Sequence, residues 1–279
     1  MIRLILVVLL QLAMYAHSSE DWCYLDAACE SSTWGLHYDA CNLNRQSPIN
    51  IVTNNVVTDA NLRPIQITGV FGSSEAHISN NGHTIEVTLN SDYILTGASL
   101  TDPHKLAGFH IHFGSLQNNI GSEHYINNQG FPLEIHFVFY NTKYQDLTTA
   151  KTQTDGLAVV GALFQIGSHN RALDTLIQAL PQVAYQGQSA PLSVDLQGIL
   201  TVYLKHYYTY KGSLTTPTCS ENVTWHIMHS IQTLSLEQYS AIASSLYYTT
   251  VDSTHPEHMI NNFRPVQPLN GRTVYRPQY

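Results

Sequence analysis

Two short stretches decide how this sequence folds: Phe109-His110-Ile111-His112-Phe113 and, further along, Glu134-Ile135-His136-Phe137. Side chains two positions apart on a β-strand point to the same face, so His110 and His112 share one face of a predicted strand. The β-branched and aromatic residues from Leu133 to Tyr140 predict a second, buried strand that carries His136. A turn-rich connection rich in Gly and Asn separates the two strands. Pairing of these strands would bring three imidazoles together.

Three imidazoles in this arrangement predict a zinc site. Three neutral nitrogen ligands leave the fourth tetrahedral position open for water, which distinguishes a catalytic zinc from a structural one. Zinc makes that water acidic enough to supply hydroxide near neutral pH, so attack on an electrophilic carbon is the expected chemistry. Glu134 shares a face with His136 and is expected to orient its imidazole. The alternative is a pair of ordinary strand histidines and a surface charge, but a third histidine beside a carboxylate favours the metal.

The segment from Phe109 to Asn141 resembles the zinc core of the α-class carbonic anhydrases. It contains Gly114-Ser115, Gly121-Ser122-Glu123-His124 and Glu134-Ile135-His136 in that family's order. Five further motifs follow the same order: Arg45-Gln46-Ser47-Pro48-Ile49-Asn50-Ile51, Asn80-Asn81-Gly82-His83, Gly156-Leu157-Ala158-Val159-Val160-Gly161, Tyr207-Tyr208-Thr209-Tyr210-Lys211-Gly212-Ser213-Leu214-Thr215-Thr216-Pro217 and Asn262-Phe263-Arg264-Pro265-Val266-Gln267-Pro268-Leu269. The resemblance extends from about Trp34 to about Leu269.

The resemblance implies both a fold and an activity. The fold would be mainly β with peripheral helices, built on a large, twisted, mostly antiparallel central sheet. The activity would be reversible hydration of CO2 to bicarbonate and a proton by zinc-bound hydroxide. The implied ligands of Zn2+ are His110, His112 and His136, with Glu134 supporting His136 from outside the coordination shell.

The resemblance also implies roles for three further residues. Thr215 would accept a hydrogen bond from the hydroxide and pass its own proton to Glu123, which orients the nucleophile. His83 would shuttle protons between the metal site and buffer, which suits an imidazole because its unperturbed pKa is about 6.5. Without the resemblance, Thr215 would be interpreted as an ordinary turn residue beside Pro217. His83 would be interpreted as a solvated turn residue after Asn81-Gly82.

CO2 is small and apolar, and the resemblance places an apolar wall beside the metal. Its expected residues are Val138, Val159, Leu214 and Trp225, with Thr216 on the opposite, polar side. The alternative is that all four apolar residues are core, although Val138 has the same strand parity as His136.

Four positions, Gly108, Leu36, Phe113 and Phe263, depart from the family's pattern, and the first two bear on the mechanism. Gly108 stands where many members place a Gln that hydrogen-bonds a ligand imidazole, and such losses typically cost about 10- to 100-fold in metal affinity or activity. Leu36 replaces an aromatic residue whose hydroxyl usually lies near the solvent network. The two departures leave the rate of the reaction open rather than its type.

Length and the N-terminus set the expected organisation. A chain of 279 residues, 43% of them hydrophobic, can form one sizeable domain. Met1-Ile2-Arg3 and the apolar run from Leu4 to Leu12 predict a secretory signal peptide over residues 1–18, too short to span a bilayer. An N-terminal extension at 19–33 and a single domain with a C-terminal tail at 34–279 complete the division. The expected location is extracellular.

The periodicity predicts a β-rich chain with few helices. Expected strands cover Pro64–Ile67, Thr84–Leu89, Lys105–Phe113, Leu133–Tyr140, Leu157–Ile166 and Leu200–Tyr208. Expected helices cover Asn170–Leu180 and Ser235–Tyr247, the second with Ser235 as N-cap.

Secretion favours disulfides, and the chain has four cysteines, which allow three pairings. Resemblance to secreted family members implies a Cys41–Cys219 bridge, which leaves Cys23 and Cys29 as a local pair. Free thiols or an intermolecular bridge are the alternatives for the second pair. Asn222-Val223-Thr224 is a glycosylation sequon, although it begins a predicted strand close to the site.

Charge and composition limit the partners. The net charge of -8 with 11% charged residues provides no basic patch for nucleic acid and no polybasic membrane anchor. The C-terminus has no apolar tail of the kind that precedes a lipid anchor. The expected partners are CO2 and bicarbonate. The alternative from another class is an extracellular matrix, mineral-associated or storage protein with the same fold. Such members usually lose at least one zinc histidine, and all three are present here.

Overall fold

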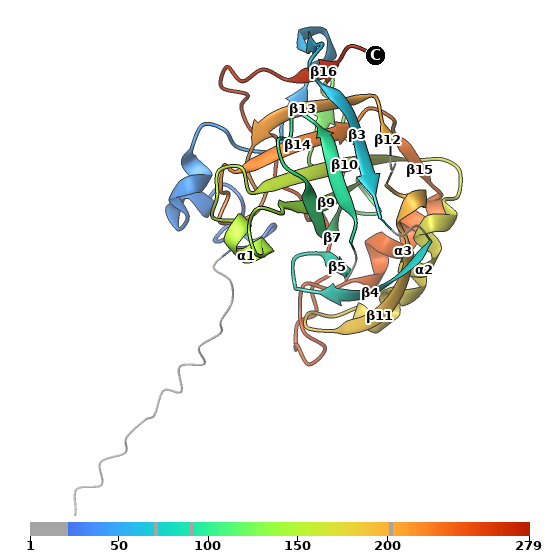
Figure 1. Cartoon of the computed structure of the whole chain (residues 1–279). Coiled ribbons are helices and arrows are strands. Elements are labelled where there is room, and N and C mark those ends of the chain that lie inside the picture. Colours follow the sequence, from blue (N-terminus) through green and yellow to red (C-terminus); the bar gives the residue numbers. More distant parts are fainter. Residues whose placement is uncertain (1–21, 70–71, 90–91, 201–202) are drawn as a thin grey trace, which may run out of the picture.

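A computed structural model describes residues 22–69, 72–89, 92–200 and 203–279 (Figure 1). The predicted signal peptide at 1–18 lies outside the described residues. Within the described residues, no helix is long and apolar enough to cross a membrane.

One large twisted sheet dominates the structure (Figure 1). Its strand order is β11 (Ser189–Asp195), β4 (Ser73–Asn80), β5 (Ile85–Leu89), β7 (His104–Phe113), β9 (Leu133–Asn141), β10 (Leu157–Ile166), β14 (Val223–Met228), β13 (Tyr207–Gly212), β16 (Tyr275–Pro277) and β2 (Val57–Asp59). Neighbours along this order are antiparallel, except that β10 pairs with β14 and β16 with β2 in parallel. The expected mainly β, mostly antiparallel architecture is confirmed.

Short strands and helices complete the fold. Off the main path lie β3 (Arg63–Thr68), β6 (Ile94–Ala98), β12 (Tyr203–Leu204) and β15 (Gln232–Leu234), and a small separate sheet pairs β1 (Asn50–Ile51) with β8 (Tyr125–Ile126). The helices are α1 (Leu147–Ala150), α2 (Asp174–Ala179) and α3 (Leu236–Ser245). In Figure 1, α2 and α3 lie together beside β4 and β11. A capping box between Ser235 and Gln238 begins α3, which confirms the predicted N-cap.

Two predicted elements were wrong in extent. The strand expected over Leu200–Tyr208 is two strands, because β12 pairs with β3 whereas β13 starts at Tyr207 and pairs with β14. The helix expected over Asn170–Leu180 is the shorter α2, with 3-10 turns at Arg171–Leu173 and Leu180–Val183 on either side. Pro181 lacks the amide hydrogen that a continuing helix would need.

Strand alternation separates the two faces of the sheet. Phe109, Ile111 and Phe137 pack into the larger hydrophobic cluster on one face. A second cluster contains Val159 and Trp225. His110, His112 and His136 alternate with the first set and so point to the opposite face. The ligands therefore face away from the larger core although their strands lie at the centre of the sheet.

Both expected disulfides are present, Cys41–Cys219 and Cys23–Cys29, and no cysteine within the described residues is free. Together with Trp22, Tyr24 and Trp34, the first of these bridges forms a small separate hydrophobic cluster. The pairing that the resemblance implied is thereby confirmed.

Candidate metal centre

The three histidines meet because β7 and β9 are neighbours in the sheet. His110 lies directly opposite His136 in the strand register. The ring centroids are 5.0 Å apart for His110–His112, 5.2 Å for His110–His136 and 4.6 Å for His112–His136. One nitrogen from each ring lies within 4.8 Å of those from the other two. The arrangement is a metal-binding triad.

The chemistry of these nitrogens fits a zinc ion. His112 Nε2 and His136 Nδ1 are buried and have no hydrogen-bond partner among the described residues. Leaving such atoms unpaired is costly, whereas a metal ion would use their lone pairs. Burial, reinforced by the other two imidazoles, lowers the pKa of His110 well below its ordinary value, and burial also lowers the pKa of His112. Neutral imidazole is the form that binds zinc.

Outer hydrogen bonds decide which nitrogen of the His112 and His136 rings faces the centre. His112 Nδ1 donates to the Asn262 carbonyl oxygen at 2.7 Å, which turns Nε2 inward. His136 Nε2 donates to Glu134 Oε1 at 2.8 Å, which turns Nδ1 inward. Such partners fix the tautomer and the orientation of a ligand imidazole. Glu134 makes the contact that its position on the strand predicts.

Glu134 is the centre of a wider buried network that sequence reasoning missed. Its Oε1 also accepts from His124 Nδ1 at 2.8 Å, and its Oε2 accepts the backbone N–H groups of Glu123 and His124 at 2.9 and 2.8 Å. His124 Nε2 lies 2.7 Å from the Tyr210 hydroxyl. Burial alone would raise the pKa of Glu134, but His124 and His136 outweigh it and hold this pKa well below its ordinary value.

The same network argues against a second metal site at His124, Glu134 and His136, although these side chains lie close enough together to hold a metal ion. Both ring nitrogens of His124 already have hydrogen-bond partners. The histidine in Gly121-Ser122-Glu123-His124 was the available sequence clue to this network.

Glu123 lies at the buried side of the centre, and Thr215 is also buried, between two residues that line the cleft. Glu123 is fully buried, its Oε1 accepts the Arg264 backbone N–H at 2.8 Å, and its Oε2 is 3.5 Å from His112 Nε2. Glu123 Oε2 has no hydrogen-bond partner among the described residues. Thr215 is 5% exposed, and the described structure records no hydrogen bond between it and Glu123. The carboxylate therefore retains one oxygen able to accept a proton donor.

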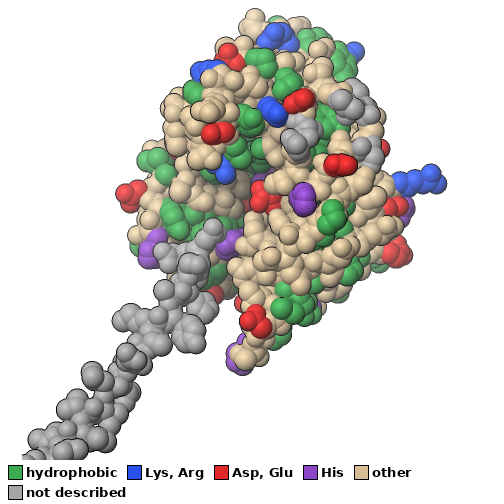
Figure 2. All heavy atoms as spheres, turned by 60° about the horizontal axis from the view of Figure 1, so that its bottom comes forward, with side chains coloured by type: hydrophobic (Ala, Val, Ile, Leu, Met, Phe, Trp, Pro, Cys, Tyr) green, Lys and Arg blue, Asp and Glu red, His purple; other side chains and the backbone are tan. Residues whose placement is uncertain are grey.

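A cleft of about 330 Å³ opens over the centre. His83, Val138, Leu214 and Thr216 line it together with His110 and His112. Figure 2 views the molecule from the bottom of Figure 1, where histidine and acidic side chains border a hollow. Val159 and Trp225, each 2% exposed, do not line the cleft. They pack behind Val138 and Leu214 in one cluster, and the Trp225 ring lies 4.7 Å from that of His136.

Residues from the predicted N-terminal extension also line the cleft, which sequence reasoning missed. The Trp22 ring stacks on His83 with centroids 3.8 Å apart and an interplanar angle of 11°. Tyr24 lines the cleft beside it. The Trp34 indole N–H donates to the carbonyl oxygens of Cys23 and Cys29, so this disulfide loop is tied to the domain. The pattern Trp-x-Tyr before Trp34 was the available clue.

Leu36 was expected to remove a hydroxyl that usually lies near the solvent network. Leu36 is 79% exposed and does not line the cleft. Tyr24, an aromatic residue with a hydroxyl, does line it.

The structure gives a physical reason for Gly108. A Cβ atom at this position would lie 2.4 Å from the Val87 carbonyl oxygen, closer than real contacts allow. The register between β7 and β9 also shifts between Leu106 and Gly108. No side chain fits here without movement of the backbone, and no hydrogen bond to the His110 ring is recorded among the described residues.

Asn222 is only 7% exposed, and its Nδ2 donates to the Lys151 carbonyl oxygen. A glycan would be attached to that nitrogen and would need it accessible. The folded structure therefore gives no support to glycosylation at Asn222.

These features define a class: a β-sheet metalloenzyme whose three-histidine centre leaves one coordination position open to a cleft. Comparison with known proteins agrees. The family profile described as eukaryotic-type carbonic anhydrase matches residues 29–278. The chain is 37% identical to carbonic anhydrase 7 of Homo sapiens, covering 87% of this chain and 92% of that protein. It is 36% identical to human carbonic anhydrase 6, over 96% of this chain and 88% of that protein. It is 35% identical to human carbonic anhydrase 12, over 92% of this chain and 73% of that protein.

The chain therefore belongs to the eukaryotic-type carbonic anhydrase family. It retains all three histidines of the zinc site.

Proposed function

We propose that this protein is a secreted zinc enzyme that catalyses the reversible hydration of CO2 to bicarbonate and a proton. The observation that carries the proposal is the triad of His110, His112 and His136 in a member of this family. The facing nitrogens of His112 and His136 are buried and have no hydrogen-bond partner among the described residues. When bound there, zinc supplies a Lewis acid and lowers the pKa of a water to about 7, a value measured on carbonic anhydrase itself rather than deduced from this chain.

Thr215 and Glu123 orient the attacking oxygen in this proposal. Glu123 is held by the Arg264 backbone N–H at one oxygen, which leaves Oε2 to accept the Thr215 hydroxyl proton. With its hydrogen committed to Glu123, the Thr215 oxygen can only accept a hydrogen bond. It therefore selects one orientation of a water in the cleft.

The substrate is held by the apolar side of the cleft. Val138 and Leu214 line this side, supported from behind by Val159 and Trp225. CO2 needs no polar partner there, and Thr216 gives the opposite side a hydroxyl for the bicarbonate product.

Secretion rests on two observations. The chain has two disulfides, which form and persist in oxidising compartments. Residues 1–18 have the composition of a signal peptide.

The test is stopped-flow CO2 hydration by the purified protein before chelation, after chelation and after zinc is restored, with His110→Ala as the control. We expect activity that disappears with the metal, returns with zinc and is lost in His110→Ala. If the folded, zinc-loaded protein shows no hydration, the catalytic proposal fails and a matrix or storage role replaces it.

His83 is the proposed proton shuttle, because it lines the cleft and its backbone N–H is fixed by Asn81 Oδ1 at 2.9 Å. We expect His83→Ala to lower kcat in weak buffer by about 100-fold, the lower end of the contribution of a positioned proton-transfer group. The value of kcat/KM should change little, and added imidazole should restore turnover. The measurement is stopped-flow hydration in weak buffer, with the exposed His255→Ala as a matched control. Unchanged turnover in His83→Ala would remove His83 from the mechanism.

A further inference from the structure

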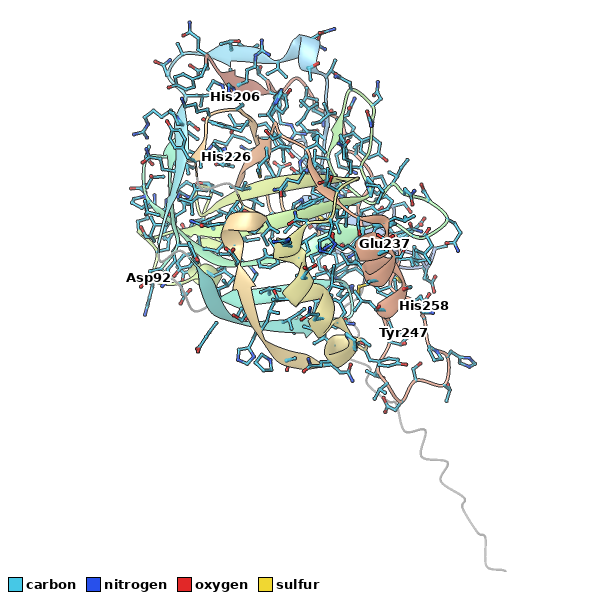
Figure 3. All side chains as sticks on the ribbon, turned by 90° about the vertical axis from the view of Figure 1, so that its right-hand side faces the viewer. Asp92, His206, His226, Glu237, Tyr247 and His258 are labelled. Atoms are coloured by element: carbon cyan, nitrogen blue, oxygen red, sulfur yellow. A yellow bond between two sulfur atoms is a disulfide. The ribbon has the colours of Figure 1, made fainter. Side chains whose placement is uncertain are left out.

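A second pocket, of about 240 Å³, lies at the far end of β13 and β14 from the zinc centre. His206 immediately precedes β13 and His229 immediately follows β14, and both line this pocket. Figure 3 shows His206 near the top of the molecule. His229 lies four residues beyond Trp225, which contacts His136, so roughly 13 Å of extended strand separates the two sites.

The two histidines are held as a pair. The His229 backbone N–H donates to the His206 carbonyl oxygen at 3.3 Å. Their ring centroids are 6.3 Å apart, and the Tyr208 ring packs against His229 at 5.5 Å. Both histidines are exposed, and no hydrogen bond to either ring is recorded among the described residues. Their ring nitrogens are therefore free to bind a ligand.

Arg276 brings a permanent positive charge to the same pocket from β16. Its Nε donates to Thr58 Oγ1 at 3.3 Å, which anchors the guanidinium. Neither terminal nitrogen has a recorded hydrogen bond in the described part of the chain. Tyr208 and Arg276 both line the pocket, and the charge of Arg276 opposes the rise that burial causes in the pKa of Tyr208. A fixed guanidinium with two unused nitrogens is suited to bidentate pairing with an oxyanion.

No acidic side chain lines this pocket, although the protein has 20 acidic residues against 12 lysines and arginines. The nearest acidic residue along the lining strands is Asp59, next to Thr58. Its carboxylate accepts hydrogen bonds from the backbone and side chain of Asn61. No Asp or Glu side chain in the lining is therefore available to neutralise the cationic groups of the pocket.

We propose that this pocket binds a small oxyanion through the guanidinium of Arg276 and the imidazoles of His206 and His229. The ligand class is a compact anion with several oxygens, such as sulfate, phosphate or bicarbonate. The guanidinium holds two oxygens and the imidazoles donate to the others. A transition metal is disfavoured, because these histidines belong to none of the potential metal-binding groups of three or more among the described residues. The site is independent of the zinc centre.

Binding should strengthen on acidification, because each imidazole gains a charge and a second donor when it is protonated. Burial raises the pKa of Tyr207 and Tyr208, so neither phenol ionises in the relevant range. The titratable and charged groups facing the two imidazoles or adjoining the pocket are Asp59, Lys205, Tyr207, Tyr208, Arg276 and Tyr279. Among these types of side chain, histidine is the one that generally acts as a switch in the physiological pH range.

The test is a sulfate titration of the zinc-loaded protein, followed through the imidazole NMR resonances of His206 and His229. Sulfate keeps its charge throughout this pH range, so any pH dependence belongs to the protein. The resonances are assigned with His206→Gln and His229→Gln. We expect saturable shifts at constant ionic strength, with affinity roughly tenfold higher at pH 5.5 than at pH 8.5.

Arg276→Gln is expected to weaken sulfate binding about tenfold or more, since it removes the charged bidentate partner. Arg171→Gln, at another exposed arginine, should leave the titration unchanged. A His206→Gln/His229→Gln double variant, followed by calorimetry, should lose the pH dependence. The proposal is overturned if chloride reproduces the shifts, if they do not saturate, or if Arg276→Gln titrates like the parent protein.

Discussion

Replacing His112 with alanine is expected to abolish zinc binding and CO2 hydration together. His112 is 1% exposed, and its Nε2 is one of the two buried ligand atoms without a protein partner. Because the two remaining imidazoles cannot complete the site, zinc affinity should fall by more than about 100-fold, beyond the usual cost of losing an outer partner. Zinc content after dialysis and stopped-flow hydration are the two measurements.

The control for His112→Ala is His77→Ala, which removes an exposed histidine from β4 and should leave metal and activity intact. His112→Ala also removes the ring N–H that donates to the Asn262 carbonyl oxygen, which should lower the free energy of unfolding by about 1–3 kcal/mol. Circular dichroism should therefore show a folded but less stable protein. If folded His112→Ala retains zinc with parental affinity, the assignment of the metal centre is wrong.

Replacing Glu134 with alanine is expected to damage stability as well as metal binding. The change removes the acceptor for two imidazole N–H groups and two backbone N–H groups, all in the buried interior. Breaking such a network should lower the free energy of unfolding by about 3–5 kcal/mol. Zinc affinity should fall about 10- to 100-fold, because the His136 ring loses the partner that orients it.

Urea unfolding of the zinc-free protein separates the stability effect from metal binding. Glu75→Ala is the matched control, since it removes an exposed carboxylate from a neighbouring part of the sheet and should change stability little. A Glu134→Ala variant as stable as Glu75→Ala would show that the network contributes nothing to folding.

The depressed pKa of Glu134 also predicts a pH dependence of stability. Its folded pKa is below the unfolded value of about 4.3, so its stabilising contribution is present above that pH and is lost as the pH falls toward the folded pKa. Zinc-free Glu134→Gln should show a weaker loss of stability than the parent protein in this acidic range.

Much of the metal centre follows from the sequence because strand parity is a local property. The spacing of His110 and His112 fixes their shared face, and the alternating Phe109 and Ile111 fix the face that packs into the core. Glu134 and His136 obey the same rule on the next strand. The motifs around them were enough to identify the fold, and the cysteine pairing followed from that resemblance.

Only the tertiary structure decided features that depend on distant segments. Trp22 stacks on His83 across 61 positions, and His124 reaches Tyr210 across 86. Gly108 is required by the carbonyl of Val87 on the adjacent strand, and Asn222 is buried by its bond to Lys151. The pairing of His206 with His229 depends on which strands end side by side. Local periodicity depends only on consecutive residues, whereas the approach of separate segments depends on strand register and packing throughout the chain.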